Sequence, residues 1–322
     1  MFPSPAPHVS VVVPLYEKRP YVGRALQSVF AQTLGTFEVI VVDDGSTDEA
    51  ASVLAEFGDA RLVVHRQEHQ GVSVARNRGA SVARAPWVAF LDADDEWLPT
   101  FLESTLRVAE ASPRLSAVFS NLRHHRIESP MLTRVSQSGG VVRDYFETLL
   151  DNDGVGITSS SVVVSKAKLI ACGGFACGVQ HAEDIDLWAR LAWSGDLGFC
   201  EEALAVYHSE IPNSASKNVL AATAQYPVFL RSYEEWSRNG RIPEKLRNSS
   251  RRYATWVLAQ NVMELAHQGR REEARQRLRS ASWKDPRDPH LWRARVWTWL
   301  PAGALRMGRQ VRTALKQGRT DR

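Results

Sequence analysis

Two clusters of carboxylates follow apolar segments of strand length. Asp43 and Asp44 come directly after VIVV, and Asp92, Asp94 and Asp95 come after VAFL. Adjacent like charges are unfavourable unless something positive neutralises them. For Asp92 and Asp94 the natural partner is a hard divalent cation such as Mg²⁺ or Mn²⁺, which takes carboxylate oxygens and bridges to phosphates. The alternative is a solvated turn whose aspartates cap the next helix.

The residues after Asp44 have a simple structural explanation. Gly45 supplies a turn, and Ser46 or Thr47 is a good N-cap for a helix over Asp48–Phe57. Capping does not explain why two carboxylates stand side by side at the strand tip. The first cluster is therefore a candidate ligand site as well as a turn.

A basic helix and an acidic helix complete the set of candidate residues. The helix beginning GVSVARNRGA could receive a phosphate at its N-terminus, where Arg76 could pair with it. An ordinary helix with basic residues on its outer face is the alternative. Glu183, Asp184 and Asp186 begin a second helix, where they favour the helix dipole or could supply a general base.

These side chains must be positioned by alternating strands and helices. Val9–Val13 and Val39–Val42 are continuous apolar runs, typical of strands buried on both faces of a parallel sheet, and Tyr21–Thr33 between them has helical spacing. The alternation continues with strands at 61–65, 87–91 and 116–120 and helices at 48–57, 72–83 and 100–111. The pattern predicts an α/β fold with an open, mostly parallel sheet flanked by helices.

The pattern changes after residue 120. No regular element is predicted from 121 to 156, where 151–156 reads as a loop. A further strand is expected at Ser161–Val164 and a helix at Ile185–Ser194. Because ligands of open α/β sheets bind at the carboxyl ends of the strands, both acidic clusters stand where a site is expected.

The C-terminal residues form a basic, tryptophan-rich helical appendage. Residues 1–230 hold 18 basic and 27 acidic side chains, whereas residues 231–322 hold 22 basic and 9 acidic ones, together with six of the ten tryptophans. Helices are expected at 251–267, 271–282 and 290–300. Residues 292–322 are expected to make peripheral contact with an anionic membrane. The alternative is that Trp256, Trp283 and Trp292 are core residues and the arginines are solvated.

Composition and length limit the class of protein. The 322 residues predict about two domains, and 44% hydrophobic with 24% charged residues indicates a folded globular chain. Three cysteines without a CxxC spacing fit a reducing compartment. The start MFPSPAPHVS lacks the features of a secretion signal, and no apolar run reaches the ~18 residues of a membrane-spanning helix. We expect a cytoplasmic protein, peripheral on the inner face of the cell membrane at most, with no nucleic-acid motif.

Taken together, these segments resemble the family 2 glycosyltransferases of the A-type nucleotide-sugar fold. The resemblance covers roughly residues 8–216. The matching segments, in the family's order, are SVVVPLYEKRPYVGRALQSVFAQT, FEVIVVDDGSTD, GVSVARNRGA, VAFLDADDEW, TSSSVVVSKAKLIACGGF and EDIDLWARLAWSG. The family likeness implies a catalytic domain over 1–224, with a nucleotide-binding half at 8–120 and an acceptor half at 121–224, followed by the helical region 225–322.

The resemblance also implies roles for the nucleotide-side residues. Asp43 resembles the carboxylate that reads the nucleotide base, with Asp44 beside it. Pro14 and Tyr16 form part of the base pocket, and Arg76 is similar to the arginine that contacts the nucleotide.

The metal and the catalytic base follow in the same way. Asp92 and Asp94, separated by Ala93 in the donor site, resemble the pair that binds Mn²⁺ or Mg²⁺, with Asp94 the direct ligand and Asp92 shared with the ribose. Asp184 is similar to the catalytic base, and Glu183 is its usual neighbour. His208 stands one or two positions before the histidine that helps hold the metal in many members, so a ligand and an ordinary loop histidine both stay open.

The resemblance implies an inverting transfer of a sugar from a nucleoside diphosphate donor, for which a UDP-sugar is the first expectation. The acceptor is expected to be a hydroxyl of a glycan or of a lipid-linked molecule, in the synthesis of envelope polysaccharide. Two alternatives use the same residues. A metal-dependent phosphohydrolase would also place an Asp-x-Asp pair at a strand end, although usually after the first strand. A non-catalytic nucleotide- or glycan-binding module would keep the acidic residues without the chemistry.

Overall fold

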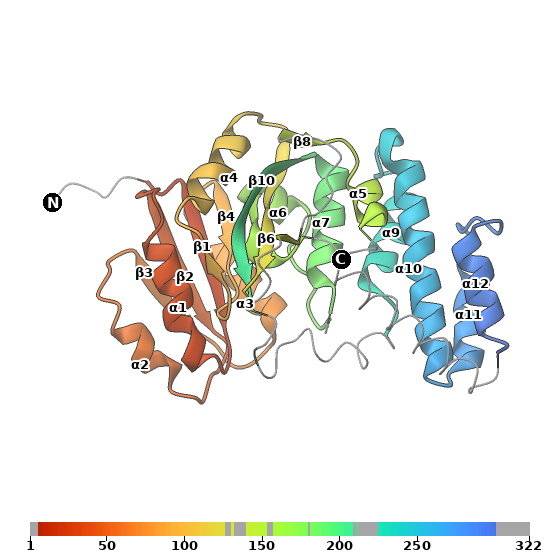
Figure 1. Cartoon of the computed structure of the whole chain (residues 1–322), viewed down its shortest axis with the longest axis horizontal. Helices are drawn as coiled ribbons and strands as arrows, with labels where there is room; N and C mark the ends of the chain where they lie inside the picture. The colour runs from red at the N-terminus through yellow and green to blue at the C-terminus, as the bar shows by residue number, and fades with distance from the viewer. Residues whose placement is uncertain are drawn as a thin grey trace. The chain divides into compact units, whose positions relative to one another are not determined.

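The computed structural model describes residues 6–125, 130–131, 140–152, 157–179, 181–208, 211 and 225–300. The chain divides into two compact units, residues Met1–Lys217 and Asn218–Arg322 (Figure 1). The first unit holds the strands and the second holds only helices among its described residues. The expected α/β fold with a helical C-terminal region is confirmed.

One sheet forms the centre of the first unit. Its strands in chain order are β1 (Val9–Leu15), β2 (Phe37–Asp43), β3 (Leu62–Arg66), β4 (Trp87–Phe90), β5 (Glu96–Trp97), β6 (Leu115–His124), β7 (Pro130–Met131), β8 (Gly140–Val142), β9 (Val162–Ser165) and β10 (Asp196–Tyr207). Their order across the sheet is β3-β2-β1-β4-β9-β6-β10-β5, with β7 on β6 and β8 on β10. The long strands β1, β2, β3, β4, β6 and β10 all run the same way, whereas β9 is antiparallel to both of its neighbours.

Helices cover both faces of this sheet (Figure 1). They are α1 (Arg19–Phe30), α2 (Ala50–Ala55), α3 (Val72–Val82), α4 (Phe101–Glu110), α5 (Tyr145–Asp151), α6 (Lys166–Ala171) and α7 (Glu183–Ser194), with a 3₁₀ turn η1 at Ser159–Ser161. Val11 and Val13 belong to the core that includes α1 and α4. Val12 points the other way, against Gly79 of α3, where a Cβ would come within 2.4 Å of it. The continuous apolar runs of β1 and β2 are thus buried on both faces, as predicted.

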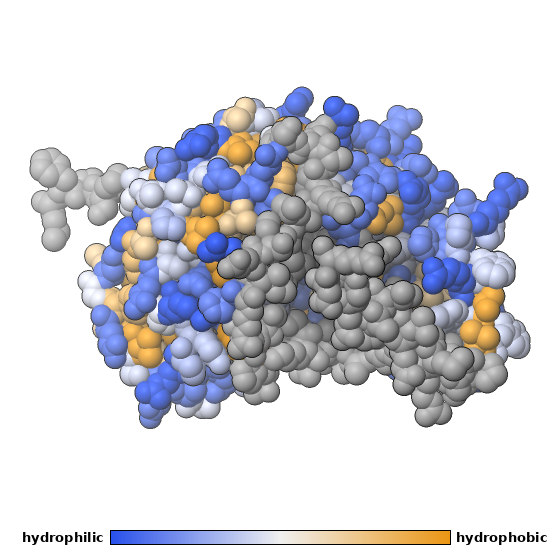
Figure 2. Space-filling model, viewed as in Figure 1, coloured by the Kyte–Doolittle hydropathy of each residue, from blue (hydrophilic) through white to orange (hydrophobic). Residues whose placement is uncertain are grey.

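Several details differ from the expectation. The strand expected at Ser161–Val164 exists as β9 but is antiparallel, and Ser161 belongs to η1. Strands β7 and β8 and helix α5 lie in the stretch where no element was predicted, and most of the expected 151–156 loop lies outside the described residues. On the face shown in Figure 2, the coloured residues are mainly hydrophilic and the apolar ones form small separate groups.

The predicted cap of α2 is wrong. The N-cap position is Glu49, whose backbone is left-handed (φ 61°) and whose side chain makes no capping hydrogen bond, whereas Asp48 Oδ1 accepts from Ala50 N (3.2 Å). Ser46 Oγ instead accepts a hydrogen bond from Glu17 N (3.2 Å), and Thr47 Oγ1 donates to the Glu17 carboxylate (2.9 Å). The polar residues after β2 therefore tie this turn to the loop after β1.

The second unit contains the helices α9 (Val228–Arg238), α10 (Arg247–His267), α11 (Arg271–Ser280) and α12 (Pro289–Trp297), with a 3₁₀ turn η3 at Glu244–Leu246. The central helix α10 packs against the other three. Trp256 and Trp283 are half-buried within this unit, whereas Trp292 is 64% exposed, and the roles expected of these tryptophans stay predictions. In the described part of the chain, none of the helices has the length and apolar character needed to span a bilayer.

Candidate active site

A cavity of about 420 Å³ opens at the carboxyl edge of the sheet. The loops after β1 and β4, the start of α3, the residues leading into η1 and the start of α7 line it. Of the predicted site residues it brings together Pro14, Tyr16, Asp44, Arg76, Asp92, Ala93, Asp94, Glu183 and Asp184. Asp43 and His208 do not line it. Segments more than 100 residues apart in the chain thus meet at the edge where parallel strands end.

Arg76 links two sides of the cavity. Only 4% exposed, it donates from Nη2 to Asp92 Oδ1 (2.6 Å) and from Nη1 to Glu183 Oε1 (2.9 Å). Its guanidinium also lies 5.2 Å from the ring centre of Phe175. Burial alone would lower the pKa of Arg76, but the two carboxylates outweigh it and raise the pKa. Its Nε has no hydrogen-bond partner among the described residues, which leaves one buried donor for a ligand.

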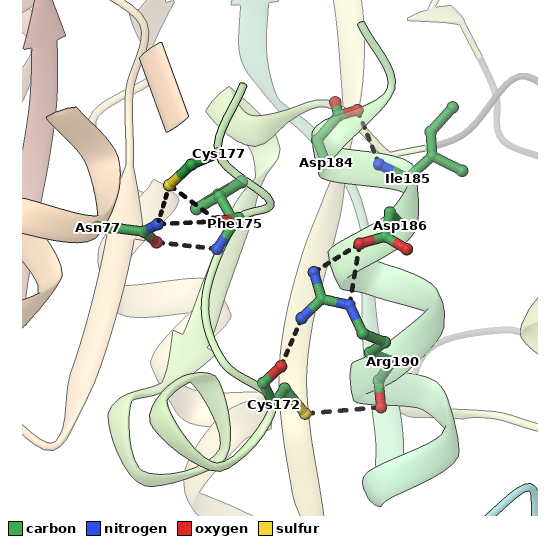
Figure 3. Close-up of polar contacts among 8 residues, drawn as sticks. All are labelled: Asn77, Cys172, Phe175, Cys177, Asp184, Ile185, Asp186 and Arg190. Atoms are coloured by element: carbon green, nitrogen blue, oxygen red, sulfur yellow. Dashed lines mark hydrogen bonds and ion pairs between the residues drawn. The ribbon is translucent and has the colours of Figure 1, made fainter. Parts of the chain in front are cut away.

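Asp184 presents a carboxylate to the cavity at the start of α7 (Figure 3). Desolvation by the surrounding protein, followed by the nearby charge of Glu183, raises its pKa to about 7, against the opposing effect of Arg76. A hydrogen bond from Ile185 N (2.7 Å) holds Oδ1. A carboxylate with a pKa near 7 is suited to accept a proton at neutral pH.

Asp186 has a different environment in the same helical turn. It is 1% exposed, and its Oδ2 accepts from Arg190 Nη2 (2.6 Å) and Nε (2.9 Å). Figure 3 shows Asp186 directed at Arg190, away from the Asp184 carboxylate. Asp186 is thus part of the packing of α7, whereas Asp184 is available to a ligand.

The loop that contains Gly174 and Phe175, before α7, is bonded to α3, the helix that carries Arg76. Asn77 of α3 exchanges two hydrogen bonds with the backbone of Phe175, each 2.8 Å long (Figure 3). Gly174 beside it has φ +68°, and a Cβ there would lie 2.5 Å from Asn77 Oδ1. Glycine is therefore required for this loop to approach α3 and to place the Phe175 ring against the guanidinium.

Asp94 faces a cation from the loop after β1. Its Oδ2 accepts from Lys18 Nζ (2.6 Å), and its backbone oxygen accepts from Arg24 Nη2 (2.5 Å). Asp92 Oδ1 is taken by Arg76. One oxygen of each carboxylate has no protein partner among the described residues. Two hard oxygen donors at the cavity fit a divalent ion such as Mn²⁺ or Mg²⁺.

The turn that carries Asp92 and Asp94 is held from beneath by η1. Ser160 Oγ accepts from Asp92 N (3.2 Å) and donates to Asp95 Oδ2 (2.6 Å). Asp95 is 2% exposed, and its pKa lies well above the usual range because it is buried and because Asp92 and Asp94 are close. This third aspartate thus holds the turn instead of lining the cavity.

The cluster after β2 is used mainly by the fold. Asp44 is 2% exposed and accepts from Gln67 Nε2 (2.7 Å), Gln70 N (2.9 Å) and Gly71 N (2.8 Å). Asp43 Oδ1 accepts from Ser46 N (2.8 Å). Both carboxylates therefore shape the loops that lead to α2 and α3, and the base-reading role of Asp43 stays a prediction.

An aromatic pair stands at the cavity. The rings of Tyr16 and His69 stack with centroids 3.9 Å apart, and the Tyr16 side chain is 43% exposed. His69 Nδ1 also lies 2.9 Å from Asp44 Oδ2, which ties the pair to β2. A planar, partly exposed ring beside cationic groups is a suitable surface for a nucleotide base.

Sequence reasoning missed several residues of this site: Lys18, His69, Ser159, Ser160 and His181. Lys18 follows β1 at the ligand-binding edge, so its place in the chain was a usable signal. The serines reach the same edge only because β9 runs antiparallel to its neighbours. The pattern of residues along the chain does not predict the direction of a strand.

The open sheet and the charged cavity at its carboxyl edge define a doubly wound α/β protein with its candidate site at the strand ends. Residues 10–156 match the model of Glycosyl transferase family 2. This is the family that the motifs of the chain resemble, and the resemblance is confirmed.

Relatives carry the same family description. An uncharacterized glycosyltransferase of Rickettsia conorii is 26% identical over 224 residues, 69% of this chain and 35% of the relative. TuaG of Bacillus subtilis, named for teichuronic acid biosynthesis, is 41% identical over 103 residues, 31% of this chain and 41% of the relative. The chain spans between 26% and 61% of the length of the curated relatives it matches.

Solved structures share the fold at low identity. TarS of S. aureus (residues 1–349), in complex with UDP-GlcNAc, superposes with a TM-score of 0.60 at 16% identity, covering 84% of this chain and 87% of that one. The mannosyltransferase PcManGT of Pyrobaculum calidifontis, in complex with GDP-Man and Mn²⁺, has a TM-score of 0.63 at 19% identity, covering 99% and 84%. These similarities confirm the A-type glycosyltransferase fold.

Proposed function

We propose that the chain is an inverting glycosyltransferase that uses a nucleoside diphosphate sugar. The observation that carries the proposal is the cavity-facing Asp184, with a pKa of about 7, in the same cavity as the cationic side chains of Lys18 and Arg76. The cations suit a diphosphate, and the carboxylate suits a proton acceptor. The family match supports a transferase over a phosphohydrolase that uses the Asp-x-Asp pair or a non-catalytic binding module.

The proposed reaction is a single displacement. An acceptor hydroxyl oxygen attacks the anomeric carbon while the bond from that carbon to the donor phosphate oxygen breaks, so the configuration inverts. The hydroxyl proton passes to Asp184, and the electron pair of the broken bond leaves with the nucleoside diphosphate. Glu183 and Arg76 orient the start of α7 and keep Asp184 in place.

Donor binding is proposed to use the remaining groups of the cavity. The base stacks on Tyr16 next to Pro14, at the tip of β1, with Asp43 and Asp44 beside it. Arg76 and Lys18 attract the diphosphate.

The metal is proposed to bind to Asp94 and Asp92 beside Ala93. A divalent ion, Mn²⁺ or Mg²⁺, held there supplies positive charge to the leaving diphosphate. The free carboxylate oxygens described above support this part of the proposal.

The donor and acceptor are the finer part of the proposal. A UDP-sugar donor is supported by the UDP-GlcNAc complex of TarS, and an envelope polysaccharide or lipid-linked acceptor by the name of TuaG. Calorimetric titration of UDP, GDP and dTDP into the full chain, with Mn²⁺ and again with chelator, tests donor binding. We expect metal-dependent binding of UDP; no binding of any of the three would overturn the proposed donor site.

A second proposal concerns the surface of the helical unit: it contacts an anionic membrane through residues from 292 onward. Trp292 and Val296, one turn apart on α12, are 64% and 37% exposed, and Trp299 just beyond is 74% exposed. Residues 231–322 carry a net charge of +13. Exposed tryptophans among basic residues suit an interface with anionic lipid. Residues 301–322 lie outside the described residues.

Liposome sedimentation tests this contact. The full chain should sediment with vesicles that contain anionic lipid and stay in solution with neutral ones. The double variant Trp292→Ala/Trp299→Ala should bind more weakly than Trp256→Phe, the control in the core of the unit. Binding that is indifferent to lipid charge removes the proposal.

A further inference from the structure

Three metal-ligating side chains meet at the ends of three strands, outside the lining of the donor cavity. They are Glu96, His125 and His208, and their ligand atoms all lie within 4.8 Å of one another. His208 Nε2 is 2.9 Å from Glu96 Oε1, and its ring stacks on that of His125 with centroids 4.4 Å apart. We propose that this cluster is a second metal site, specific for an ion of the Zn²⁺ class.

The backbone holds the three residues together. Strand β5 pairs with β10 so that Glu96 lies opposite Val206, and β10 pairs with β6 so that Tyr207 lies opposite His124. His125 and His208 are each the next residue along, and His125 N donates to Tyr207 O (3.0 Å). The sheet register thus brings the three residues together before any ion is bound, which reduces the entropy that binding must overcome.

The ligand set differs in kind from that of the donor cavity. Two imidazoles and one carboxylate suit Zn²⁺, which binds three protein ligands and an exchangeable fourth in open sites. Asp92 and Asp94 offer only carboxylate oxygens, which suit Mg²⁺ or Mn²⁺. The two sites therefore differ in the metal ions that their ligands prefer.

The geometry requires a small adjustment. Ligand atoms at ~2.1 Å from a tetrahedral Zn²⁺ lie about 3.4 Å apart, so the widest pair, at 4.8 Å or less, must close by at most about 1.4 Å. Glu96 and His208 are already close enough. His125 is the exposed member, so rotation of its side chain can complete the site while buried His208 stays in place.

The position of the site indicates what the ion does. His208 N donates to Asp95 Oδ1 (3.2 Å), and Asp95 holds the turn that carries Asp92 and Asp94. An ion bound by the cluster fastens β5 to the ends of β6 and β10 directly behind that turn. It should stabilise the folded chain by mass action without entering the donor cavity.

Titration of Zn²⁺ into the purified full chain, followed by calorimetry, tests the site, with Co²⁺ as a second probe because tetrahedral Co²⁺ absorbs visible light. We expect one Zn²⁺ site in the wild-type chain and in Asp94→Asn. His125→Gln, which changes the exposed ligand, should weaken Zn²⁺ binding at least about 100-fold and abolish the Co²⁺ bands. His65→Gln on β3 is the matched histidine control and should bind as the wild type does.

Two results would overturn the proposal. One is unchanged Zn²⁺ affinity in His125→Gln, and the other is absence of Zn²⁺ binding to the wild-type chain at micromolar concentration. Loss of Zn²⁺ binding in Asp94→Asn with retention in His125→Gln would place the ion in the donor cavity and would equally overturn it. Because no readout is an activity, the result is independent of the proposed transferase reaction.

Discussion

The acidic clusters after β2 and β4 stand at the same edge of one sheet, yet their carboxylates have different partners. Asp44 accepts hydrogen bonds from two backbone amides and a half-buried glutamine of the neighbouring loop, which follows β3. Asp92 and Asp94 are each paired through one oxygen with the side chain of Arg76 or Lys18. Both oxygens of Asp44 therefore have protein partners, whereas Asp92 and Asp94 each keep one oxygen without a partner among the described residues.

The largest effect is expected at Asp184, which is the carboxylate most clearly free of the fold. Asp184→Asn should lower the transfer rate by about 10²–10⁴-fold, because the proton acceptor is lost, and should leave nucleotide binding nearly unchanged. Initial rates with a UDP-sugar and calorimetric titration of UDP measure the two quantities. Asp196→Asn, at the start of β10, is the control and should keep full activity; an active Asp184→Asn enzyme would mean that another group takes the proton.

The pH dependence of the transfer rate also tests whether Asp184 is the general base. A general base must be ionised, and the pKa of Asp184 is raised to about 7. We expect kcat/KM to fall about tenfold for each pH unit below 7 and to level off above it. A rate profile from pH 5 to pH 9 measures this, and a profile that stays flat down to pH 5 would exclude Asp184 as the base.

The Asp44 carboxylate should act on stability. Asp44→Asn retains one acceptor oxygen for several donors, so we expect the free energy of unfolding to fall by about 2–3 kcal/mol. Thermal or urea unfolding measures it, and Glu68→Gln, an exposed residue of the loop after β3 that donates to Asp44, is the control. If Asp44→Asn unfolds like the wild type, the contrast between the clusters is broken.

Asp94→Asn should weaken ligand binding and leave the stability of the fold nearly unchanged. Losing a charged ligand is expected to weaken metal-dependent UDP binding by about tenfold or more, while the free energy of unfolding changes by less than about 1 kcal/mol, because Asp94 has a partly exposed ion pair. Calorimetry with Mn²⁺ and a urea unfolding curve measure the two. Metal-independent UDP binding by the wild type would remove the role given to Asp94.

The smallest expected effect is a gain in stability. The native fold raises the pKa of Asp184 above its usual 3.8, so it favours the protonated form, and stability falls as the pH rises from about 4 to 7. Asp184→Asn removes the free-energy cost of ionising this buried carboxyl group, and its amide oxygen can still accept the hydrogen bond from Ile185 N. We expect a melting temperature higher than that of the wild type at pH 8, and no gain near pH 4. An equal shift at both pH values would contradict this.

Local patterns were sufficient for much of the architecture and for the cavity. The uninterrupted valines of β1 and β2 predicted strands buried on both faces, and the rule for strand ends placed Asp44, Asp92 and Asp94 at one edge, whereas the roles of Arg76 and Asp184 came from the family resemblance. Periodicity does not report strand direction, so the reversal of β9 and the arrival of Ser160 were invisible. Nor does it distinguish a capping serine from one that bonds a distant loop, as Ser46 does with Glu17.

His208 shows the limit of reading roles from position. The sequence left it between a donor-site ligand and a loop histidine, but its surroundings depend on register: β10 carries it past Tyr207 to Glu96 and His125. Register is set by pairing among strands about 80 residues apart, which no local spacing encodes.

The reversal of β9 has a consequence for how the chain folds. Strands β4 and β6 are synthesised before β9, the strand at 162–165 that joins them, so the facing edges of β4 and β6 stay unpaired until that segment emerges from the ribosome. Such edges are the surfaces through which nascent chains aggregate. Residues 162–165 therefore cover these edges by pairing with both strands. A chain truncated before them keeps the edges exposed and should be found in inclusion bodies.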